Sequence, residues 1–565
     1  MPRYRVEPLP AAHRWRVTLD LPAPAARQAL SMAAWTPGSY MRRDYVRHVM
    51  AIAATQRGRP VALERDGLAG WVAACSGRAT LTVVYEVHAL DTSVRGCWVD
   101  AERGFVNGPA LFLRAAGHEA LPHRVAFARL PRGWQVATAM RAAGSGFEAT
   151  DLDELLDHPF ALGTGWRGRF SAGGVPHEFF VQGAWPRFDG ARLVADTQRI
   201  CEAQIRFWHG RSKPPFGRYV FLLHVRDDAY GGLEHRASTA ITCARRDLPR
   251  EGVAELADGY ANLLALVSHE YFHTWNVQRI RPQGLAGADL SREHPSPLLW
   301  FFEGFTSYYD ELMLLRAGLV DRARWLRQVA KALNATLATP GRHVQSLADA
   351  SWDAWTRYYQ RDANTPNATV SYYDRGALVA LLTDLALRRA GGTLDAVMRS
   401  LLKHRQPIGE AEILAALPPA VAAELHGWVH GTGELPLAPA LQAFGIALRR
   451  ELPPLAAQLG LKLAESAFTG IQVQSVLAGS AAEAAGLAPG DELLAADGWR
   501  LRRLDDLRQW VAPGGAFDLT VVRDQRLATL RVQPAATPAA PLVALADDER
   551  AGAAALALRR AWLGG

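Results

Sequence analysis

Hydrophobic and polar positions alternate along the first 165 or so residues of the chain. The runs Arg14–Leu21, Leu81–His88 and Arg124–Leu130 place apolar side chains at about every second position, and turns rich in Gly, Pro and Asp separate them. This period of two predicts short β-strands, arranged as in a sandwich or barrel. The segment Trp35–Val49 contains a Pro-Gly turn, and its spacing predicts a packed strand and loop.

From about Arg192 the apolar positions recur every three to four residues, which predicts helices. One strand-like run, Arg218–Val225, interrupts the early part of this region. We therefore expect a mainly helical region with some sheet over residues 166–450. The predicted helical blocks are Glu251–Asn276, Pro297–Ala317, Ala323–Leu337, Ser371–Arg389 and Gly392–Leu402.

Short strands and turns return after the pair Pro453–Pro454, which marks a domain boundary. The Ala/Pro-rich segment Pro534–Pro541 is expected to be a linker, and Ala544–Trp562 a final helix. The pattern predicts a multidomain α+β protein, divided into residues 1–165, 166–450, 451–534 and 535–565. The strands predicted in the third part are Gly470–Val476, Asp491–Ala496, Phe517–Val522 and Ala528–Val532.

The composition is that of a globular protein, with 49% hydrophobic and 21% charged residues. The net charge of +7 comes with only four Lys among 63 basic residues, and acidic residues are interleaved with the Arg. No local basic cluster forms, so we expect no nucleic-acid partner. The N-terminus lacks the apolar core of a signal peptide and no run is long enough to span a bilayer, so we expect a cytoplasmic protein with no membrane partner.

The strongest chemical signal is the sequence His269-Glu270-Tyr271-Phe272-His273, an HExxH motif. No Pro or Gly lies between Ala261 and Trp275, so the motif can be helical. Positions i and i+4 share one face of a helix, and both imidazoles can bind one metal ion there. Glu270 lies beside them and can act as the general base toward a water molecule.

A second pair, His426 and His430, has the same spacing but no Glu between the two residues. Gly427 also stands inside the predicted helix. Because the acid that would supply the base is missing, we interpret this pair as structural or surface histidines.

Two histidines leave Zn²⁺ short of protein ligands, because catalytic sites use three and keep the fourth position open. Glu303, in the segment Trp300–Phe305 (WFFEGF), is flanked by large apolar residues, so its helix face is expected to be buried. A buried carboxylate is costly unless it is paired or bound to a metal. The sequence therefore predicts that His269, His273 and Glu303 hold one Zn²⁺ per chain.

The combination of HExxH with W-x-x-E-G-F resembles the gluzincin metallopeptidases, and in particular their aminopeptidase N branch. Two further segments fit that branch in the expected order: Tyr230–His235 (YGGLEH) is similar to its G-x-M-E-N motif, and Tyr373–Gly376 (YDRG) to its Y-x-K-G motif. The resemblance implies that Gly231, Gly232 and Glu234 bind the substrate, with Glu234 on its α-amino group. It also implies that Tyr373 stabilises the oxyanion.

The fit narrows with HEYFHTWN (His269–Asn276), FFEGFTSYY (Phe301–Tyr309), WTPGSY (Trp35–Tyr40) and a PDZ-like C-terminal segment. Together these resemble the glycyl aminopeptidase family. The resemblance implies an N-terminal β-rich domain over 1–165, a thermolysin-like catalytic domain over 166–450 and a PDZ domain over 451–534. It further implies peptide substrates with a free N-terminus, beginning with Gly or Ala.

Three departures concern the details of this resemblance. The gap of 29 residues between His273 and Glu303 is longer than in the aminopeptidase N branch, so an insertion must loop out. His235 and Leu233 replace the Asn and Met of the exopeptidase motif, and Arg375 replaces a Lys. The metal ligands are unaffected.

The PDZ resemblance rests on a loop and several turns. Leu459, Gly460 and Leu461 are similar to the loop whose backbone N–H groups hold the carboxylate of a peptide C-terminus, and Arg503–Val511 would be the helix lining the groove. Turns at 479–482, 485–487 and 489–492 also fit. The segment either binds a peptide C-terminus as an added strand or only packs against the catalytic domain, and the sequence leaves both open.

The sequence favours a zinc aminopeptidase over two alternatives. A zinc endopeptidase would use the same site, and would differ only in whether Glu234 and nearby loops close the non-primed side. A PDZ-carrying adaptor would have an inactive peptidase site, against which the complete set of HExxH, Glu303 and Tyr373 argues. No feature selects an epoxide-hydrolysing activity.

Overall fold

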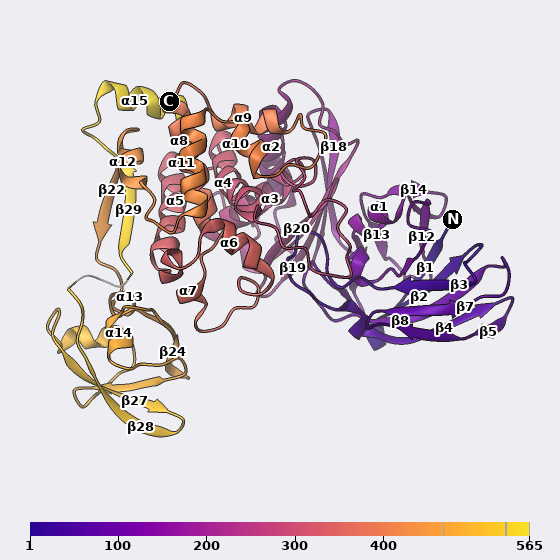
Figure 1. The fold of residues 1–565 in the computed structure, drawn as a ribbon, viewed down its shortest axis with the longest axis horizontal. Helices are drawn as coiled ribbons and strands as arrows, with labels where there is room; N and C mark the ends of the chain where they lie inside the picture. The colour runs from indigo at the N-terminus through magenta and orange to yellow at the C-terminus, as the bar shows by residue number, and fades with distance from the viewer. Residues whose placement is uncertain (467, 537–539, 564–565) are drawn as a thin grey trace. The chain divides into compact units, whose positions relative to one another are not determined.

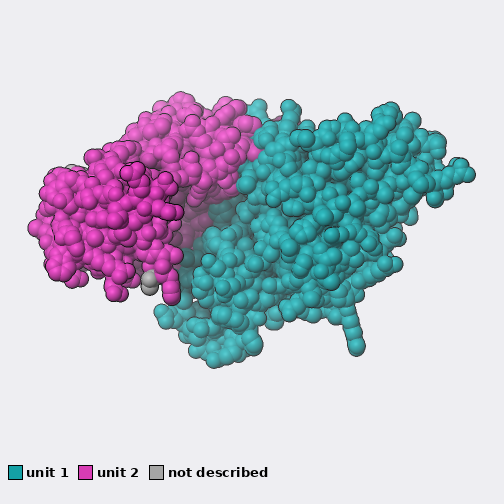
Figure 2. Space-filling model, turned by 90° about the horizontal axis from the view of Figure 1, so that it is seen from below, with its two compact units in different colours: residues 1–294 teal, residues 295–565 magenta. Residues whose placement is uncertain are grey.

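A computed structural model describes residues 1–466, 468–536 and 540–563 of the chain (Figure 1). The chain forms two compact units, Met1–His294 and Pro295–Gly565, which Figure 2 distinguishes by colour. The boundary between these units falls within the predicted domain 166–450, and the predicted division at residues 165, 450 and 534 stays a prediction. No helix among the described residues is long and apolar enough to cross a membrane.

The first part of the chain is built from β-strands, as its alternating pattern predicts. The strands β2 (Arg14–Leu21) and β8 (Leu81–His88) have the predicted bounds and pair with each other, whereas β12 (His123–Phe127) ends before Leu130. They belong to an eight-stranded sheet in the order β14-β15-β12-β1-β2-β8-β4-β5. Its other strands are β1 (Arg3–Leu9), β4 (Val49–Gln56), β5 (Arg59–Val61), β14 (Arg141–Ala143) and β15 (Gly146–Ala149).

Two four-stranded sheets complete this β-rich part, in the orders β11-β3-β7-β6 and β13-β16-β10-β9. A short helix, α1 (Leu152–Asp157), begins at Asp151, whose side chain accepts a hydrogen bond from the Glu154 N–H. The strands are β3 (Arg27–Ser31), β6 (Leu63–Asp66), β7 (Gly70–Ala74), β9 (Cys97–Val99), β10 (Arg103–Val106), β11 (Arg114–Ala115), β13 (Gln135–Ala137) and β16 (Phe160–Gly163).

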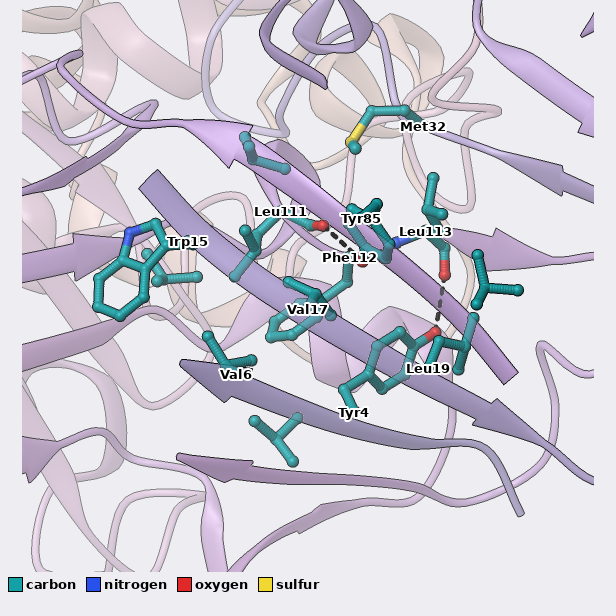
Figure 3. Packing of buried hydrophobic residues seen from close by; sticks show 14 of the residues in the cluster. Tyr4, Val6, Trp15, Val17, Leu19, Met32, Tyr85, Leu111, Phe112 and Leu113 are labelled. Carbon is teal, nitrogen blue, oxygen red and sulfur yellow. Dashed lines mark hydrogen bonds between the residues drawn. The ribbon is translucent and has the colours of Figure 1, made fainter. Parts of the chain in front are cut away.

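The core of this part lies between the large sheet and the buried segment around residues 111–113 (Figure 3). Two buried tyrosines join them, because the Tyr4 hydroxyl donates to the Leu113 carbonyl at 2.7 Å and the Tyr85 hydroxyl donates to the Leu111 carbonyl at 2.9 Å. Each bond satisfies a backbone group that would otherwise be buried without a partner. The aromatic side chains therefore both fill the core and fix this segment.

The second half of unit 1 holds a five-stranded sheet, ordered β17-β18-β19-β21-β20, of which the sequence predicts one strand. That strand is β19 (Tyr219–Arg226); the others are β17 (Trp166–Ala172), β18 (Val175–Gln182), β20 (Tyr230–Glu234) and β21 (Ser238–Ala244). Most positions of β18, β19 and β21 are buried, so their sequences show no alternation. The helices α2 (Gly190–His209) and α3 (Asp258–Phe272) pack together, and α3 lies against β20 and β21.

Unit 2 begins with helices around a central one, α8 (Asp374–Arg389), which contacts α4, α5, α11 and α12. The four helices predicted between residues 297 and 402 are present with shifted ends. The remaining helices of this part are α4 (Thr306–Arg316), α5 (Arg322–Leu337), α6 (Leu347–Trp352), α7 (Thr365–Ala368), α9 (Leu394–Leu401), α10 (Glu410–Ala415), α11 (Pro419–His430) and α12 (Leu437–Gln442).

The C-terminal sheet has the order β23-β24-β25-β27-β28, with β26 beside β25. The helix predicted over Arg503–Val511 is instead a 3-10 helix over Leu504–Gln509, ended by Trp510 and the turn that follows. The elements are α13 (Leu455–Leu459), β23 (Leu461–Ser466), β24 (Gly470–Val476), α14 (Ala481–Ala484), β25 (Glu492–Ala496), β26 (Trp499–Arg500), β27 (Phe517–Arg523) and β28 (Arg526–Val532).

The final helix is shorter than predicted. Residues of the predicted block Ala544–Trp562 first form part of a strand, β29 (Leu542–Asp547), which pairs with β22 (Ile446–Glu451), and α15 (Ala553–Leu563) follows. Val543 and Leu545 are buried at alternate positions, a period of two that a run of apolar residues and alanines obscures. Of the predicted linker Pro534–Pro541, residues 537–539 lie outside the described residues.

Strand β8 carries a matched pair of valines that tests its register. Val83 is fully buried, whereas the next residue, Val84, is 37% exposed on the other face. We expect Val83→Ala to lower the free energy of unfolding by about 2 kcal/mol, because it removes two methyl groups from a packed core. Val84→Ala should cost less than about 0.5 kcal/mol. Urea unfolding followed by circular dichroism measures both, and equal losses would contradict the register.

Candidate active site

The two histidines of the HExxH motif lie at the C-terminal end of α3. His269 belongs to the last turn and His273 is the capping residue, still with helical dihedral angles, so the predicted common face is kept. Their Nε2 atoms are 3.0 Å apart. The His273 Nδ1 lies 2.9 Å from the Asn276 carbonyl and donates to it. This bond leaves the Nε2 lone pair of His273 available to a metal ion.

Helix α3 is held from two sides, which fixes the direction of these histidines. The Gln204 amide on α2 donates to the Ser268 carbonyl at 2.8 Å. On the other side the Tyr271 hydroxyl lies 2.9 Å from the His177 Nε2 on β18. Ser268, just before the motif, therefore joins the helix to α2, and Tyr271, inside the motif, joins it to the sheet.

Glu270 is buried against strand β20. A Cβ atom placed on Gly232 would collide with the Glu270 carboxylate, so that carboxylate lies directly on the backbone of β20. Any larger residue at position 232 would displace Glu270. The segment that the resemblance assigns to substrate binding thus lies beside the candidate general base.

Glu234, at the end of β20, is buried against the turn Trp35–Tyr40. A Cβ atom on Gly38 would lie 2.6 and 2.7 Å from the two Glu234 carboxylate oxygens, and Gly38 has a φ of +79°. Only glycine combines this conformation with this approach. The strand predicted within Trp35–Val49 was wrong: Ser39 N–H donates to the Thr36 carbonyl in a turn, and β4 starts at Val49.

The insertion after HExxH supports this turn. The Trp35 indole donates to the Arg292 carbonyl at 2.8 Å, and the Ala34 N–H donates to the Leu290 carbonyl at 2.7 Å. The part of the 29-residue gap that lies in unit 1 therefore does more than connect helices. It fixes the turn that carries Gly38.

Arg95 is a further residue at β20 that the sequence did not reveal. Its guanidinium donates to the Gly232 carbonyl at 2.9 Å. Its own carbonyl accepts from the Asn107 amide at 2.8 Å and the Tyr45 hydroxyl at 2.6 Å. No motif marks it, because its role depends on a contact between segments about 137 residues apart.

His235, the departure from the exopeptidase motif, is buried beside Asp157 with 3.5 Å between Nδ1 and Oδ1. Burial alone would raise the pKa of Asp157, but the hydrogen bond and charge of His235 hold that pKa below its usual value. The side chain is thus engaged with α1. Leu233 is fully buried in the core beneath the strand.

In unit 2, Glu303 lies buried on a π-helical turn, Trp300–Phe305, where the sequence predicts a regular helix. Such turns occur often at functional sites. Gly304, the next residue, packs on the segment that carries Tyr373: a Cβ there would lie 2.8 Å from the Tyr372 carbonyl and would also meet Gly376. The two motif glycines allow these backbones to touch, which brings Glu303 near Tyr373.

Tyr373 caps the N-terminus of α8, and its hydroxyl lies 3.2 Å from that of Tyr359. Burial, together with the nearby charge of Glu303, raises the pKa of Tyr373 well above its usual value. The hydroxyl therefore stays protonated at neutral pH and can donate a hydrogen bond. Arg375 points elsewhere, because its guanidinium donates to the Gly433 carbonyl at 2.7 Å.

The predicted carboxylate loop connects α13 to the edge strand β23. Leu459 ends the helix, Gly460 caps it with a φ of +80°, and Leu461 begins the strand. The Gly460 N–H donates to the Ala457 carbonyl at 3.3 Å, and the Gly460 carbonyl accepts from the Leu477 N–H at 2.8 Å. In this structure Gly460 is engaged within the helix end, so its role toward a peptide carboxylate stays a prediction.

Residues 262–379 match the family model for M61 glycyl aminopeptidase, residues 3–164 that of the M61 N-terminal domain, and residues 472–523 that of a PDZ domain. The crystal structure of an aminopeptidase N family protein from Idiomarina loihiensis is 30% identical over 100% of both chains, with a TM-score of 0.93. The chain belongs to the M61 glycyl aminopeptidase family. It is a metallopeptidase of that family.

Membership confirms the predicted fold class: an N-terminal β-rich domain, a thermolysin-like, mainly helical domain and a C-terminal PDZ domain. More distant structures include the M1 zinc metallopeptidase from Deinococcus radiodurans, at 14% identity over 77% of this chain and 94% of that chain (TM-score 0.47). Native yeast LTA4 hydrolase matches at 13% over 78% and 70% of the two chains (TM-score 0.43). No curated protein sequence matches the chain.

The contact between Gly232 and Glu270 gives a test of the site. We expect Gly232→Ala to lower kcat/KM on peptide substrates by about a hundredfold, because the methyl group displaces the carboxylate from its position. Gly217→Ala is the matched control, since a Cβ there meets no atom within 4 Å. Metal content and thermal midpoint should be unchanged in both variants. Full activity in Gly232→Ala would show that the position of Glu270 is not critical.

Proposed function

We propose that this protein is a zinc aminopeptidase, which hydrolyses the first peptide bond of peptides that have a free amino group and begin with Gly or Ala. One observation carries the proposal: strand β20 lies beside Glu270 at Gly232 and ends at Glu234, whose carboxylate abuts the turn at Gly38. A substrate lying along β20 would meet the Glu234 carboxylate and the turn at Gly38. Glu234 lies two residues along the strand from Gly232, the residue that contacts the general base Glu270. The preference for Gly or Ala rests on the family alone.

The proposed metal ligands are His269, His273 and Glu303. Two imidazoles and one carboxylate are a common donor set of catalytic Zn²⁺, and it leaves one position open. His273 and Glu303 are both buried, and a buried carboxylate such as Glu303 needs a positive partner. Bound Zn²⁺ supplies a Lewis acid and makes water nucleophilic at neutral pH.

Glu270 acts as the general base in this mechanism. It takes a proton from the attacking water and returns it to the nitrogen of the leaving amine. The backbone of β20 restricts its carboxylate through Gly232. Tyr373 donates a hydrogen bond to the developing oxyanion, an interaction worth about 3 kcal/mol of the barrier in comparable sites.

Glu234 binds the α-ammonium group of the substrate. Its carboxylate is nearly fully buried, so an ammonium group that reaches it gains a strong charge-assisted interaction. A blocked or internal peptide bond lacks this group and cannot form the charge-assisted interaction with Glu234. The turn at Gly38 further limits the space beyond Glu234. These features favour an aminopeptidase over an endopeptidase on the same site.

The test compares alanyl-p-nitroanilide with its N-acetylated form on zinc-loaded protein, with Glu270→Gln as the blank. We expect cleavage of the free amine only. Glu234→Gln should lower kcat/KM for the free amine by about a hundredfold, because loss of one partner of a desolvated charge pair costs about 3 kcal/mol. The exposed Glu251→Gln is the control and should match the unchanged protein.

Each other outcome selects an alternative. Equal cleavage of both substrates would assign an endopeptidase and remove the role of Glu234. Cleavage of neither, repeated over a panel of N-terminal residues with zinc bound, would favour an adaptor that binds peptides through the PDZ domain.

Variants of Tyr373 and Tyr359, whose hydroxyls are neighbours, test which of the two is the oxyanion donor. We expect Tyr373→Phe to lower kcat by about a hundredfold with little change in KM, because the hydrogen bond forms only in the transition state. Tyr359→Phe keeps the Tyr373 hydroxyl and should lose less than about tenfold. Steady-state kinetics on alanyl-p-nitroanilide measure both. Equal losses would mean that Tyr373 acts only through the packing of the pair.

A further inference from the structure

Three metal-ligating side chains that the proposed mechanism does not use converge on the surface of unit 2. Glu410 begins α10, and His426 and His430 lie on one face of α11. The His426 Nδ1 is 3.1 Å from the Glu410 Oε1, and the His430 Nε2 is 2.9 Å from the same oxygen. One ligand atom from each of the three residues lies within 4.8 Å of the others.

From the sequence we interpreted His426 and His430 as structural or surface histidines. Both are exposed, and helix α11 continues through Gly427. The sequence could not show Glu410, because it comes from another helix. A hydrogen bond from one imidazole to Glu410 would be enough to join α10 and α11. Here both rings, with centroids 4.4 Å apart, turn a nitrogen toward the same carboxylate.

We propose that Glu410, His426 and His430 bind a second Zn²⁺ ion. Two imidazoles and a carboxylate suit Zn²⁺ better than Mg²⁺ or Ca²⁺, which prefer oxygen ligands. The His426, His430 and Glu410 side chains are 58%, 41% and 21% exposed, so the remaining coordination positions face water. Such an ion exchanges with the solvent more readily than one held by buried ligands.

The site stabilises the fold rather than hydrolysing substrate. Gly427 stands where HExxH has its glutamate, so the motif offers no general base beside the first histidine. An ion held here joins the start of α10 to the last turn of α11. Helix α11 packs on α8, which begins directly after Tyr373 (Figure 1). Because the ligands converge only in the folded chain, zinc binding should raise its stability.

The experiment titrates full-length protein, already holding one equivalent of zinc, with further Zn²⁺ in a calorimeter. We expect one additional equivalent in the unchanged protein and a higher thermal midpoint with added Zn²⁺. His426→Gln and His430→Gln should lose this equivalent, and Glu410→Gln should bind it about tenfold more weakly or worse. His404→Gln is the matched control, since His404 is exposed in the same region but outside the cluster.

Three results would overturn the proposal. The unchanged protein would take up no further zinc, His430→Gln would take up as much as the unchanged protein, or His404→Gln would lose as much as His430→Gln. Circular dichroism without added zinc checks that the variants fold. Because the substituted histidines are exposed, we expect the same midpoint as in the unchanged protein. The outcome does not depend on peptidase activity, so it is separate from the test of the proposed function.

Discussion

The close approach of two glycines to buried carboxylates at strand β20 is the constraint on which the candidate site depends. In the middle of the strand Gly232 leaves just enough room for Glu270, and at its end Glu234 lies against Gly38, which the N-terminal β-rich part supplies. A Cβ atom on either glycine would collide with the neighbouring carboxylate. The spacing between the proposed base Glu270 and the proposed ammonium partner Glu234 is thereby set by contacts with the backbone. The backbone is more rigid than a side chain, which can change its rotamer.

Three carboxylates of the candidate site are buried. Glu234, Glu270 and Glu303 are all less than 10% exposed. Burial of an ionised carboxylate is strongly unfavourable unless a positive group or hydrogen-bond donors compensate it. In the proposed function a metal ion compensates Glu303 and a substrate ammonium compensates Glu234. In this proposal the buried carboxylates favour binding of positive groups, because a metal ion and a substrate ammonium both carry the opposite charge.

Sequence reasoning succeeded where one local pattern determines the structure. The strands Arg14–Leu21 and Leu81–His88 have one buried face, so their alternation predicts their exact bounds. It failed for β18 and β21, which are buried on both faces and therefore lack a period. It also failed for Arg95 and Gly38, whose roles depend on contacts with β20 across long stretches of chain. The π-helical turn at Glu303 was not predicted either, because all residues of Trp300–Phe305 are buried and apolar periodicity does not distinguish it from a regular helix.

The two His-x-x-x-His pairs of this chain show what spacing alone determines. Spacing places two imidazoles on one face in both α3 and α11, and both pairs direct nitrogens toward a common point. The surroundings decide the chemistry. At α3 the next residue is an acid pressed against a strand that can align a substrate, whereas at α11 it is a glycine and the imidazoles face water. Metal affinity can therefore arise from a helix and one carboxylate, but hydrolysis requires the base and the strand as well.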